Sequence, residues 1–175
     1  MFQLEDTPLH IAARKRDLKI LQALIRHNAD VNARNFNGET ALHCAVRKDG
    51  EATMRLLLDA GVDVNARDTV GHLDGATALH LAVSLGSLYA VKLLLLRKAD
   101  PDRREKNGRT PLRRACEQGQ SIVLQSLIEA GAEVDETDWV GDDGKFGDYN
   151  AKKKDQRTER KVRPLNLDQP SNLQN

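Results

Sequence analysis

The feature that most constrains this chain is an internal repeat. Four similar tetrapeptides, TPLH, TALH, TALH and TPLR, begin at Thr7, Thr40, Thr77 and Thr110. Their starts are separated by 33, 37 and 33 residues, and a second phrase of the type NADVNA ends 26 residues after each threonine. Self-similarity at this period is typical of solenoids, in which short units stack and bury a continuous core between them.

Within each unit, the apolar residues fall into two groups with spacings of three and four, which predicts two helices. In the first unit these groups are Leu9, Ala12 and Ala13, followed by Ile20, Leu21, Leu24 and Ile25. The first group consists mainly of small residues and the second is rich in leucine. The first helix of each unit can therefore lie close to its neighbours.

These motifs resemble the ankyrin-repeat family, whose T-P-L-H-x-A signature and 33-residue period match about residues 4 to 141. The resemblance implies an all-α ankyrin-repeat solenoid. Each unit would contain a β-hairpin-like finger, an inner helix, an outer helix and a return loop. We expect an array over 1–141 and a polar, basic, disordered tail over 142–175, with repeats at about 2–34, 35–67, 72–104 and 105–137 and a vestigial finger at 138–141.

Two positions depart from the regular pattern of the units. Lys98 follows the outer helix of the third unit, at a place where left-handed backbone favours the Asn28, Gly61 or Gly131 of the other units. The Asp49-Gly50 pair puts a glycine one place later than in the neighbouring units. We therefore expect the turn between the two helices of the second unit to be shifted.

The composition argues against several functional classes. Basic and acidic residues nearly cancel, at 27 against 26, so no overall field favours nucleic acid or a membrane. The two cysteines, Cys44 and Cys116, do not make a disulfide framework. The chain begins without a signal-peptide pattern, and its apolar stretches are too short to span a bilayer. These features predict an intracellular protein, cytoplasmic or nuclear or both, without a membrane segment.

The histidines are the first candidates for catalysis or metal binding. His10, His43 and His80 occupy the same position of their units, and Arg113 replaces them in the fourth, which a ladder of metal ligands would not tolerate. The resemblance implies instead that each histidine clips the threonine of its own motif. Because nucleophile and phosphate-loop motifs are also lacking, we predict no catalytic residue, no metal and no cofactor, and a protein that is not an enzyme.

The resemblance further implies that fingertips and inner helices line a concave face that binds another protein. Phe36, Leu73, Leu85 and Trp139 are apolar at positions that need not be buried, although Phe36 and Trp139 could instead pack on adjacent fingers. The residues expected on this face are Arg14, Lys15, Phe36, Asn37, Glu39, Arg47, Lys48, Leu73, Asp74, Ser84, Leu85, Lys106, Asn107, Arg109, Glu117, Gln118 and Trp139.

Charges are less evenly spread than the total suggests. Six basic residues and one acid lie between Arg103 and Arg114, which favours an acidic ligand segment there, with a solvated finger as the alternative. The first unit is expected to have the polar outer face of a capping repeat, supplied by Arg14, Lys15, Arg16 and Lys19.

The tail carries a run of basic residues that could be a nuclear-import signal or an ordinary solvated segment: Lys152, Lys153, Lys154, Arg160, Lys161 and Arg163. Direct nucleic-acid binding is disfavoured, because no aromatic stacking platform or recognition helix accompanies these charges. Asn32 and Asn65 each follow Asp-Val and have a leucine eight residues before, which resembles the site of asparagine hydroxylation in ankyrin proteins.

The prediction is a monomeric, non-enzymatic protein–protein interaction module that acts as a scaffold, adaptor or regulator. Two alternatives stay open at this point. One is a nucleic-acid- or chromatin-associated regulator that uses the basic tail. The other is a fragment of a longer ankyrin protein whose activity lies elsewhere.

Overall fold

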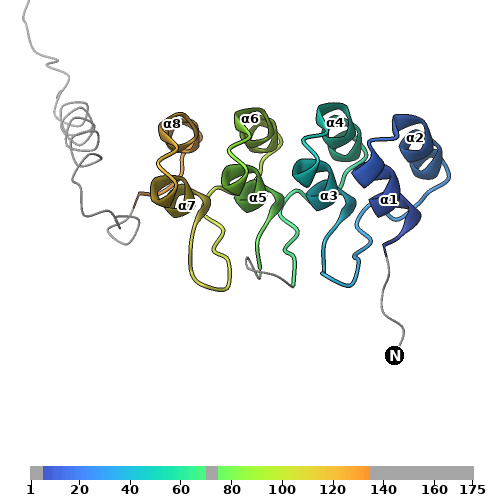
Figure 1. The fold of residues 1–175 in the computed structure, drawn as a ribbon, viewed down its shortest axis with the longest axis horizontal. Helices are drawn as coiled ribbons and strands as arrows, with labels where there is room; N and C mark the ends of the chain where they lie inside the picture. Colours follow the sequence, from blue (N-terminus) through green and yellow to red (C-terminus); the bar gives the residue numbers. More distant parts are fainter. Residues whose placement is uncertain (1–5, 70–74, 135–175) are drawn as a thin grey trace, which may run out of the picture. The chain divides into compact units, whose positions relative to one another are not determined.

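The computed structural model describes residues 6–69 and 75–134. Contacts divide the chain into two parts, Met1–Val140 and Gly141–Asn175, and every described residue belongs to the first. The described residues form helix pairs that stand in a row (Figure 1). The pairs are α1 (Pro8–Lys15) with α2 (Leu18–Arg26), α3 (Ala41–Arg47) with α4 (Glu51–Asp59), α5 (Ala78–Ser84) with α6 (Leu88–Leu96), and α7 (Pro111–Glu117) with α8 (Ser121–Glu129).

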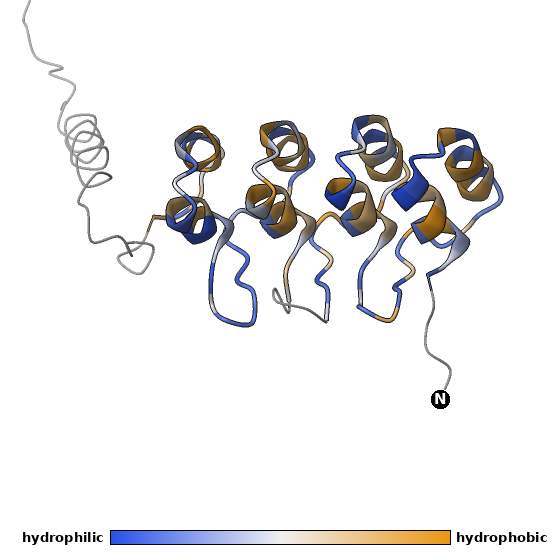
Figure 2. Cartoon of the chain, in the orientation of Figure 1, coloured by the Kyte–Doolittle hydropathy of each residue, from blue (hydrophilic) through white to orange (hydrophobic). Residues whose placement is uncertain are grey.

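Each helix packs on its counterpart in the next unit. The inner helices α1, α3, α5 and α7 contact one another in that order, and so do the outer helices α2, α4, α6 and α8. The leucines of the two predicted stripes form the core, and they are at most 2% exposed at Leu9, Leu42, Leu79 and Leu112 in the inner helices and at Leu57, Leu94 and Leu127 in the outer helices. In Figure 2 each helix combines hydrophobic and hydrophilic residues, whereas the finger of the fourth unit is hydrophilic. The predicted all-α solenoid is confirmed.

The helices begin where the sequence predicts. A threonine in extended conformation precedes every inner helix, and Pro8 and Pro111 take the first helical position, where no amide proton is needed. At the start of α7, the Thr110 hydroxyl accepts a hydrogen bond of 3.1 Å from the backbone N–H of Arg113. None of the helices in the described part has the length and apolar character needed to cross a membrane.

The turn between the two helices of the second unit is not shifted, so that prediction is wrong. Asp49 itself adopts the left-handed conformation, with φ of 49°, as Gly86 and Gly119 do at the same place in their units. Gly50 instead precedes α4 with φ of −87° and is buried beside Arg16. Aspartate tolerates left-handed backbone better than most residues, and this is why the turn keeps its register.

Lys98 is held in left-handed backbone, with φ of 67°, while its side chain is exposed. Because a Cβ atom is unfavourable in that conformation, replacing Lys98 with glycine should stabilise the fold by about 1 kcal/mol. The measurement is urea unfolding followed by circular dichroism, with Lys92→Gly as the control. Lys92 is also exposed but lies inside α6, so glycine there should destabilise by about 1 kcal/mol. Equal effects of the two changes would contradict the assignment of Lys98 to a strained position.

The fingers are narrow loops that are closed at their base by backbone hydrogen bonds. The N–H of Asn35 donates to the carbonyl of Glu39 at 3.0 Å, and Glu105 and Arg109 form the same bond in the fourth unit. The third finger is longer, because its motif threonine follows the previous one by 37 residues instead of 33, and the N–H of Asp68 there donates to the carbonyl of Ala76 at 2.9 Å. Neighbouring fingers also touch, since the N–H of Thr69 donates to the carbonyl of Asn37 at 2.8 Å.

Gly38 and Gly108 occupy the same place in their fingers, with φ of 70° and 75°. A Cβ at Gly38 would lie 2.8 Å from the backbone nitrogen of Thr69, whereas a Cβ at Gly108 would meet nothing within 4 Å. Gly108→Ala should therefore cost about 1 kcal/mol from backbone strain alone, and Gly38→Ala about 3 kcal/mol because the clash is added. Parallel urea titrations of both variants test this difference. If the two losses are equal, the second and third fingers do not pack as described.

Candidate partner-binding face

The fingertips and the C-terminal ends of the inner helices form the surface on which partner binding is expected, here called the inner face. Most residues predicted there are exposed: Arg14, Lys15, Phe36, Arg47, Lys48, Leu85, Lys106, Asn107, Glu117 and Gln118. Asn37, Ser84 and Arg109 are half-buried, and Glu39 is buried. Leu73, Asp74 and Trp139 lie outside the described residues.

Glu39 was expected to be accessible on the inner face, but it is only 4% exposed. Its carboxylate accepts a hydrogen bond of 3.0 Å from Nε of Arg47 and one of 3.3 Å from the side-chain amide of Asn35. Burial alone would raise the pKa of Glu39, but the charge of Arg47 and the two hydrogen bonds outweigh it and leave this pKa below its usual range. Glu39 therefore supports the finger and positions Arg47, and it presents no carboxylate to a partner.

The basic run of the fourth unit is largely neutralised within the fold. Arg114 is bound to the buried Glu105 at 2.5 Å, and Arg103 lies 3.1 Å from Asp100. Arg109 and Arg113 both contact Glu117, at 3.1 and 3.2 Å. These ion pairs remove most of the support for an acidic ligand segment at this run. Counting charges in the sequence did not reveal the carboxylate partners.

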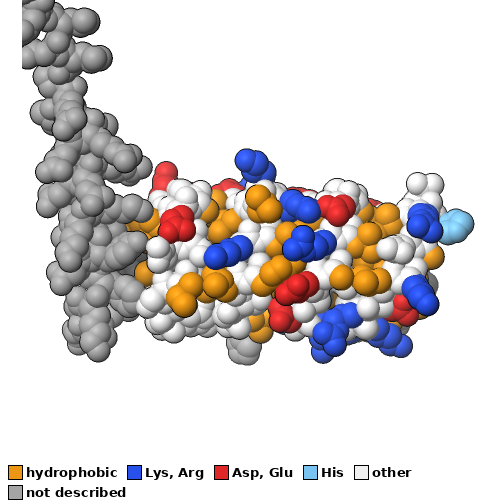
Figure 3. Space-filling view, turned by 90° about the horizontal axis from the view of Figure 1, so that it is seen from above, with side chains coloured by type: hydrophobic (Ala, Val, Ile, Leu, Met, Phe, Trp, Pro, Cys, Tyr) orange, Lys and Arg blue, Asp and Glu red, His pale blue; other side chains and the backbone are white. Residues whose placement is uncertain are grey.

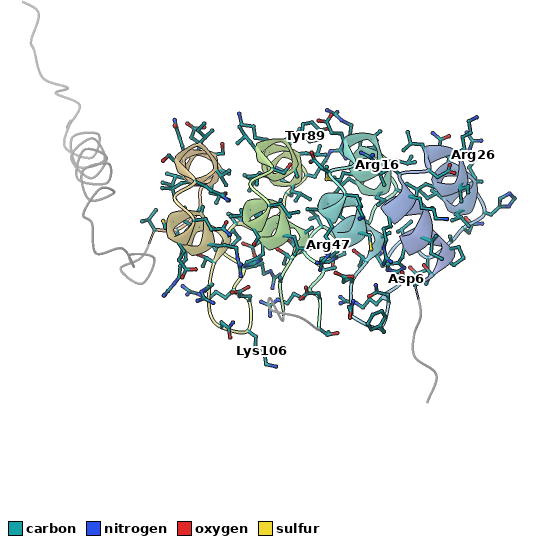
Figure 4. All side chains as sticks on the ribbon, in the orientation of Figure 1. Asp6, Arg16, Arg26, Arg47, Tyr89 and Lys106 are labelled. Carbon is teal, nitrogen blue, oxygen red and sulfur yellow. The ribbon has the colours of Figure 1, made fainter. Side chains whose placement is uncertain are left out.

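Two apolar side chains of the inner face are open to solvent. Phe36, at the tip of the second finger, is 60% exposed, and Leu85, the C-cap residue that follows α5, is 55% exposed. This exposure of Phe36 argues against its packing on an adjacent finger. Lys106 stands at the corresponding fingertip of the fourth unit, where its side chain points away from the fold (Figure 4).

The ends of the inner helices change character along the array. The first and second units carry Arg14-Lys15 and Arg47-Lys48, whereas the third carries Ser84-Leu85 and the fourth Glu117-Gln118. The helix ends of the inner face thus change from basic in the first two units to apolar in the third, and in the fourth Glu117 is already paired with Arg109 and Arg113. The opposite side, formed by the outer helices, is instead a patchwork of apolar, basic and acidic side chains (Figure 3).

The recurring histidines make structural contacts. In each of the first three units, the histidine Nδ1 lies 2.8–2.9 Å from the hydroxyl of the motif threonine and accepts the backbone N–H of that threonine. The other nitrogen then carries the proton, and it lies 2.8 Å from the carbonyl of Glu39 in His10 and 3.2 Å from that of Arg109 in His80. The carbonyl of Ala76 approaches His43 in the same way without reaching hydrogen-bond geometry. His10 and His80 thus link their own units to the next.

Two of these histidines are held neutral. Burial lowers the pKa of His43 and of His80 to about 4, against an ordinary value of 6.5. A neutral, buried imidazole whose Nδ1 is held by the motif threonine is not arranged for acid–base chemistry. In the described part of the chain, no three histidine, cysteine or carboxylate side chains come together as metal ligands would.

Both candidate hydroxylation sites take part in contacts between units. The side-chain oxygen of Asn32 accepts the N–H of Asp63 at 2.7 Å, and that of Asn65 accepts the N–H of Asp100 at 2.9 Å. Asp102 continues the series by accepting the N–H of Glu133 at 2.8 Å. The hydroxylation itself remains a prediction. The residues of the basic tail, from Lys152 to Arg163, lie outside the described part.

Sequence reasoning missed a row of buried polar side chains at the finger bases. Asn35, Asp68 and Glu105 occupy equivalent positions, and each is only 3% exposed. Asp68 accepts the N–H of Ala76 at 2.8 Å, and burial raises the pKa of its carboxyl to about 6. These polar residues recur immediately before each finger, and this recurrence was the available signal. It was missed because polar residues are also common in loops.

Comparison with known proteins agrees with this architecture. A family model described as ankyrin repeats (3 copies) matches residues 2–68 and 69–138. The mouse B-cell lymphoma 3 protein homolog is 34% identical over 132 residues, which are 75% of this chain and 30% of that protein. The chicken nuclear factor NF-kappa-B p105 subunit is 37% identical over 141 residues, 79% of this chain and 14% of that protein.

A further relative is the human protein phosphatase 1 regulatory subunit 27. It is 44% identical over 71 residues, which are 41% of this chain and 46% of that protein. The chain thus spans less than half the length of each of these relatives.

Proposed function

Because the chain belongs to the ankyrin-repeat family, we propose that it is a non-enzymatic interaction module that binds a protein partner on its inner face. The name of the human relative describes a regulatory subunit of a phosphatase. By analogy, the role proposed for this chain is that of an adaptor or regulator.

The exposure of Phe36 and Leu85 carries this proposal. The burial of Leu79 and Leu42 fixes the inner helices, and hydrogen bonds at the finger base fix the tip that presents Phe36. Both apolar side chains are therefore held in solvent by rigid surroundings, which reduces the entropy that is lost when a partner covers them. Large apolar side chains beside arginine are typical of the residues that dominate protein–protein affinity.

The change from basic helix ends in the first two units to the apolar Leu85 in the third indicates how a partner would be oriented. A bound segment with acidic residues over Lys15 and Lys48, and an apolar residue against Leu85, would complement the face from the first unit to the third. Complementary charges of this kind mainly increase the association rate and fix the register. Binding should therefore weaken as salt concentration rises.

Affinity capture with the full chain, followed by mass spectrometry, tests the proposal. We expect the chain to retain a defined set of proteins, and Phe36→Ala together with Leu85→Ala to lose them. Ile122→Ala is the matched control, because Ile122 is 67% exposed but lies on the outer helix α8. Unchanged capture by the Phe36/Leu85 variant, or loss with Ile122→Ala, would show that binding does not use the inner face.

A further inference from the structure

One position of the inner face occurs at the same place in every unit and changes its chemistry from unit to unit. It lies eight residues after the motif threonine, at the C-terminal end of the inner helix, and it is occupied by Lys15, Lys48, Leu85 and Gln118. All four side chains are exposed. Because equivalent positions of a solenoid follow one another along its axis, these side chains form a row across the inner face, here called the contact row.

The two lysines of the contact row are available to a partner. Among the described residues, no carboxylate forms an ion pair with Lys15 or Lys48. Arg14 and Arg47 precede them in the sequence, but each of these arginines is already held in an ion pair by a carboxylate of its own unit. An acidic residue of a partner should therefore bind at the lysines and not at the arginines.

The distance between units determines which residues of a partner can reach the contact row together. Packed helices are usually about 8–10 Å apart, and the inner helices α1, α3 and α5 pack on one another in succession (Figure 1). A polyproline II segment advances by about 9 Å in three residues and then presents a side chain in the same direction again. An α-helix needs about seven residues for a similar advance, and its side chains rotate by about 20° at each such step.

Two observations favour the polyproline II segment over a helix. The row joins Lys15, Lys48 and Leu85 in three successive units, so a bound helix would have rotated by about 40° when it reached Leu85. The inner face also presents an aromatic side chain, Phe36, which is 60% exposed at its fingertip. Polyproline II segments characteristically bind to grooves that aromatic side chains line.

We propose that the inner face binds a polyproline II segment of its partner. Two acidic residues of that segment, three positions apart, contact Lys15 and Lys48, and a large apolar residue three positions further contacts Leu85. The inference rests on the proposed function, because it names the kind of segment that the inner face recognises. The spacing is the same for both directions of the segment, since the acidic residue that contacts Lys48 is central in either case.

Selection from a library of random peptides tests the spacing. Peptides of about sixteen residues, displayed on phage and selected on the full chain, are long enough for steps of three or of seven residues. We expect the enriched peptides to contain two acidic residues and a large apolar residue at steps of three. Enrichment of steps of seven, of peptides without acidic residues, or of no peptide would overturn the proposal.

Charge reversal tests the contact at the centre of the row. Lys48→Glu should weaken the binding of a fluorescently labelled, enriched peptide by roughly tenfold or more, because it brings like charges together. A peptide with lysine in place of its central acidic residue should bind this variant as the original peptide binds the wild type.

The matched control for this charge reversal is Lys92→Glu. Lys92 is exposed on the outer helix α6, so the same change of charge there should alter peptide binding by less than about twofold at physiological salt. Equal losses in the Lys48 and Lys92 variants would overturn the proposed contact, because the peptide would then respond only to net charge.

The same peptides distinguish a failure of this inference from a failure of the proposed function. Peptides that bind the variant with Phe36→Ala and Leu85→Ala as tightly as the wild type would contradict both. Peptides that this variant no longer binds, but that lack the steps of three, would retain the inner face as the binding surface and would overturn only the polyproline II segment.

Discussion

Replacing Arg114 with leucine is expected to lower the free energy of unfolding by about 3–5 kcal/mol, the usual cost of removing one partner of a buried ion pair. The side chain of Glu105 is fully buried, and that of Arg114 is 11% exposed. Their atoms meet at 2.5 Å at the base of the fourth finger. Without the arginine, Arg109 remains, with a nitrogen 3.8 Å from the Glu105 carboxylate. The loss is measured by urea unfolding at pH 7.

The other units supply the control for this change. The second unit has Asn35 and Cys44 at the two positions, and the third has Asp68 and Leu81, so neither contains the ion pair. Combining Arg114→Leu with Glu105→Asn removes both charges and builds a pair of side chains close to that of the second unit. We expect the double variant to recover stability to within about 1 kcal/mol of the wild type. A double variant as unstable as Arg114→Leu alone would show that shape, and not the unpaired carboxylate, determines the loss.

Lowering the pH from 7 to 4 is expected to reduce the free energy of unfolding by about 3 kcal/mol in total. The burial of neutral His43 and His80 alone would cost about 6 kcal/mol, and Asp68 offsets about half of that loss. Their pKa values are about 4 in the folded state, against 6.5 for an ordinary histidine. Between these values the unfolded chain binds two protons that the folded chain does not bind. Stability is therefore complete above pH 6.5 and falls as the pH decreases toward 4.

Asp68 partly offsets this loss. Burial raises the pKa of its carboxyl to about 6, above the ordinary 3.8, so the folded chain binds a proton there before the unfolded chain does. Protonation of Asp68 consequently stabilises the fold as the pH falls below 6. The net uptake on unfolding between pH 6 and pH 4 is about one proton, and this limits the slope to about 1.4 kcal/mol per pH unit.

The variant Asp68→Asn isolates the contribution of Asp68 to the pH dependence of stability. Asparagine keeps the oxygen that accepts the N–H of Ala76, and Asn35 already occupies the same position in the second unit. We expect this variant to be more stable than the wild type at pH 7 and to lose nearly twice as much stability between pH 7 and pH 4. Urea titrations at four or five pH values measure both effects. A wild-type stability that does not change between pH 7 and pH 4.5 would contradict the neutral burial of the histidines.

Much of the fold could be predicted because the same pattern of motif and apolar residues occurs in four successive units. The motif threonines mark the start of every inner helix, and the apolar stripes identify core leucines such as Leu42 and Leu94. The clip role of His10 and His80 followed from the resemblance to ankyrin proteins, and the structure shows both contacts. The family assignment and the helical solenoid were therefore available from sequence.

The surface was harder to predict, because side-chain pairing depends on contacts between units that the sequence does not display. Glu39 has the composition of an exposed finger residue, yet Arg47 and Asn35 hold it in a buried site. Arg14 and Arg16 have the composition of a polar cover, yet both pack toward the second unit. For the candidate binding face, sequence located the exposed Phe36 and Leu85 but not the carboxylates that neutralise the fourth unit.

Hydrogen–deuterium exchange on the chain with and without its captured partner tests the proposed binding face most directly. We expect the partner to slow exchange in the fingers around residues 34–39 and 104–109 and at the C-terminal ends of α3 and α5. Exchange in the exposed parts of the outer helices α4, α6 and α8 should stay unchanged. Protection confined to the outer helices, with no change in the fingers or inner helices, would contradict binding on the inner face.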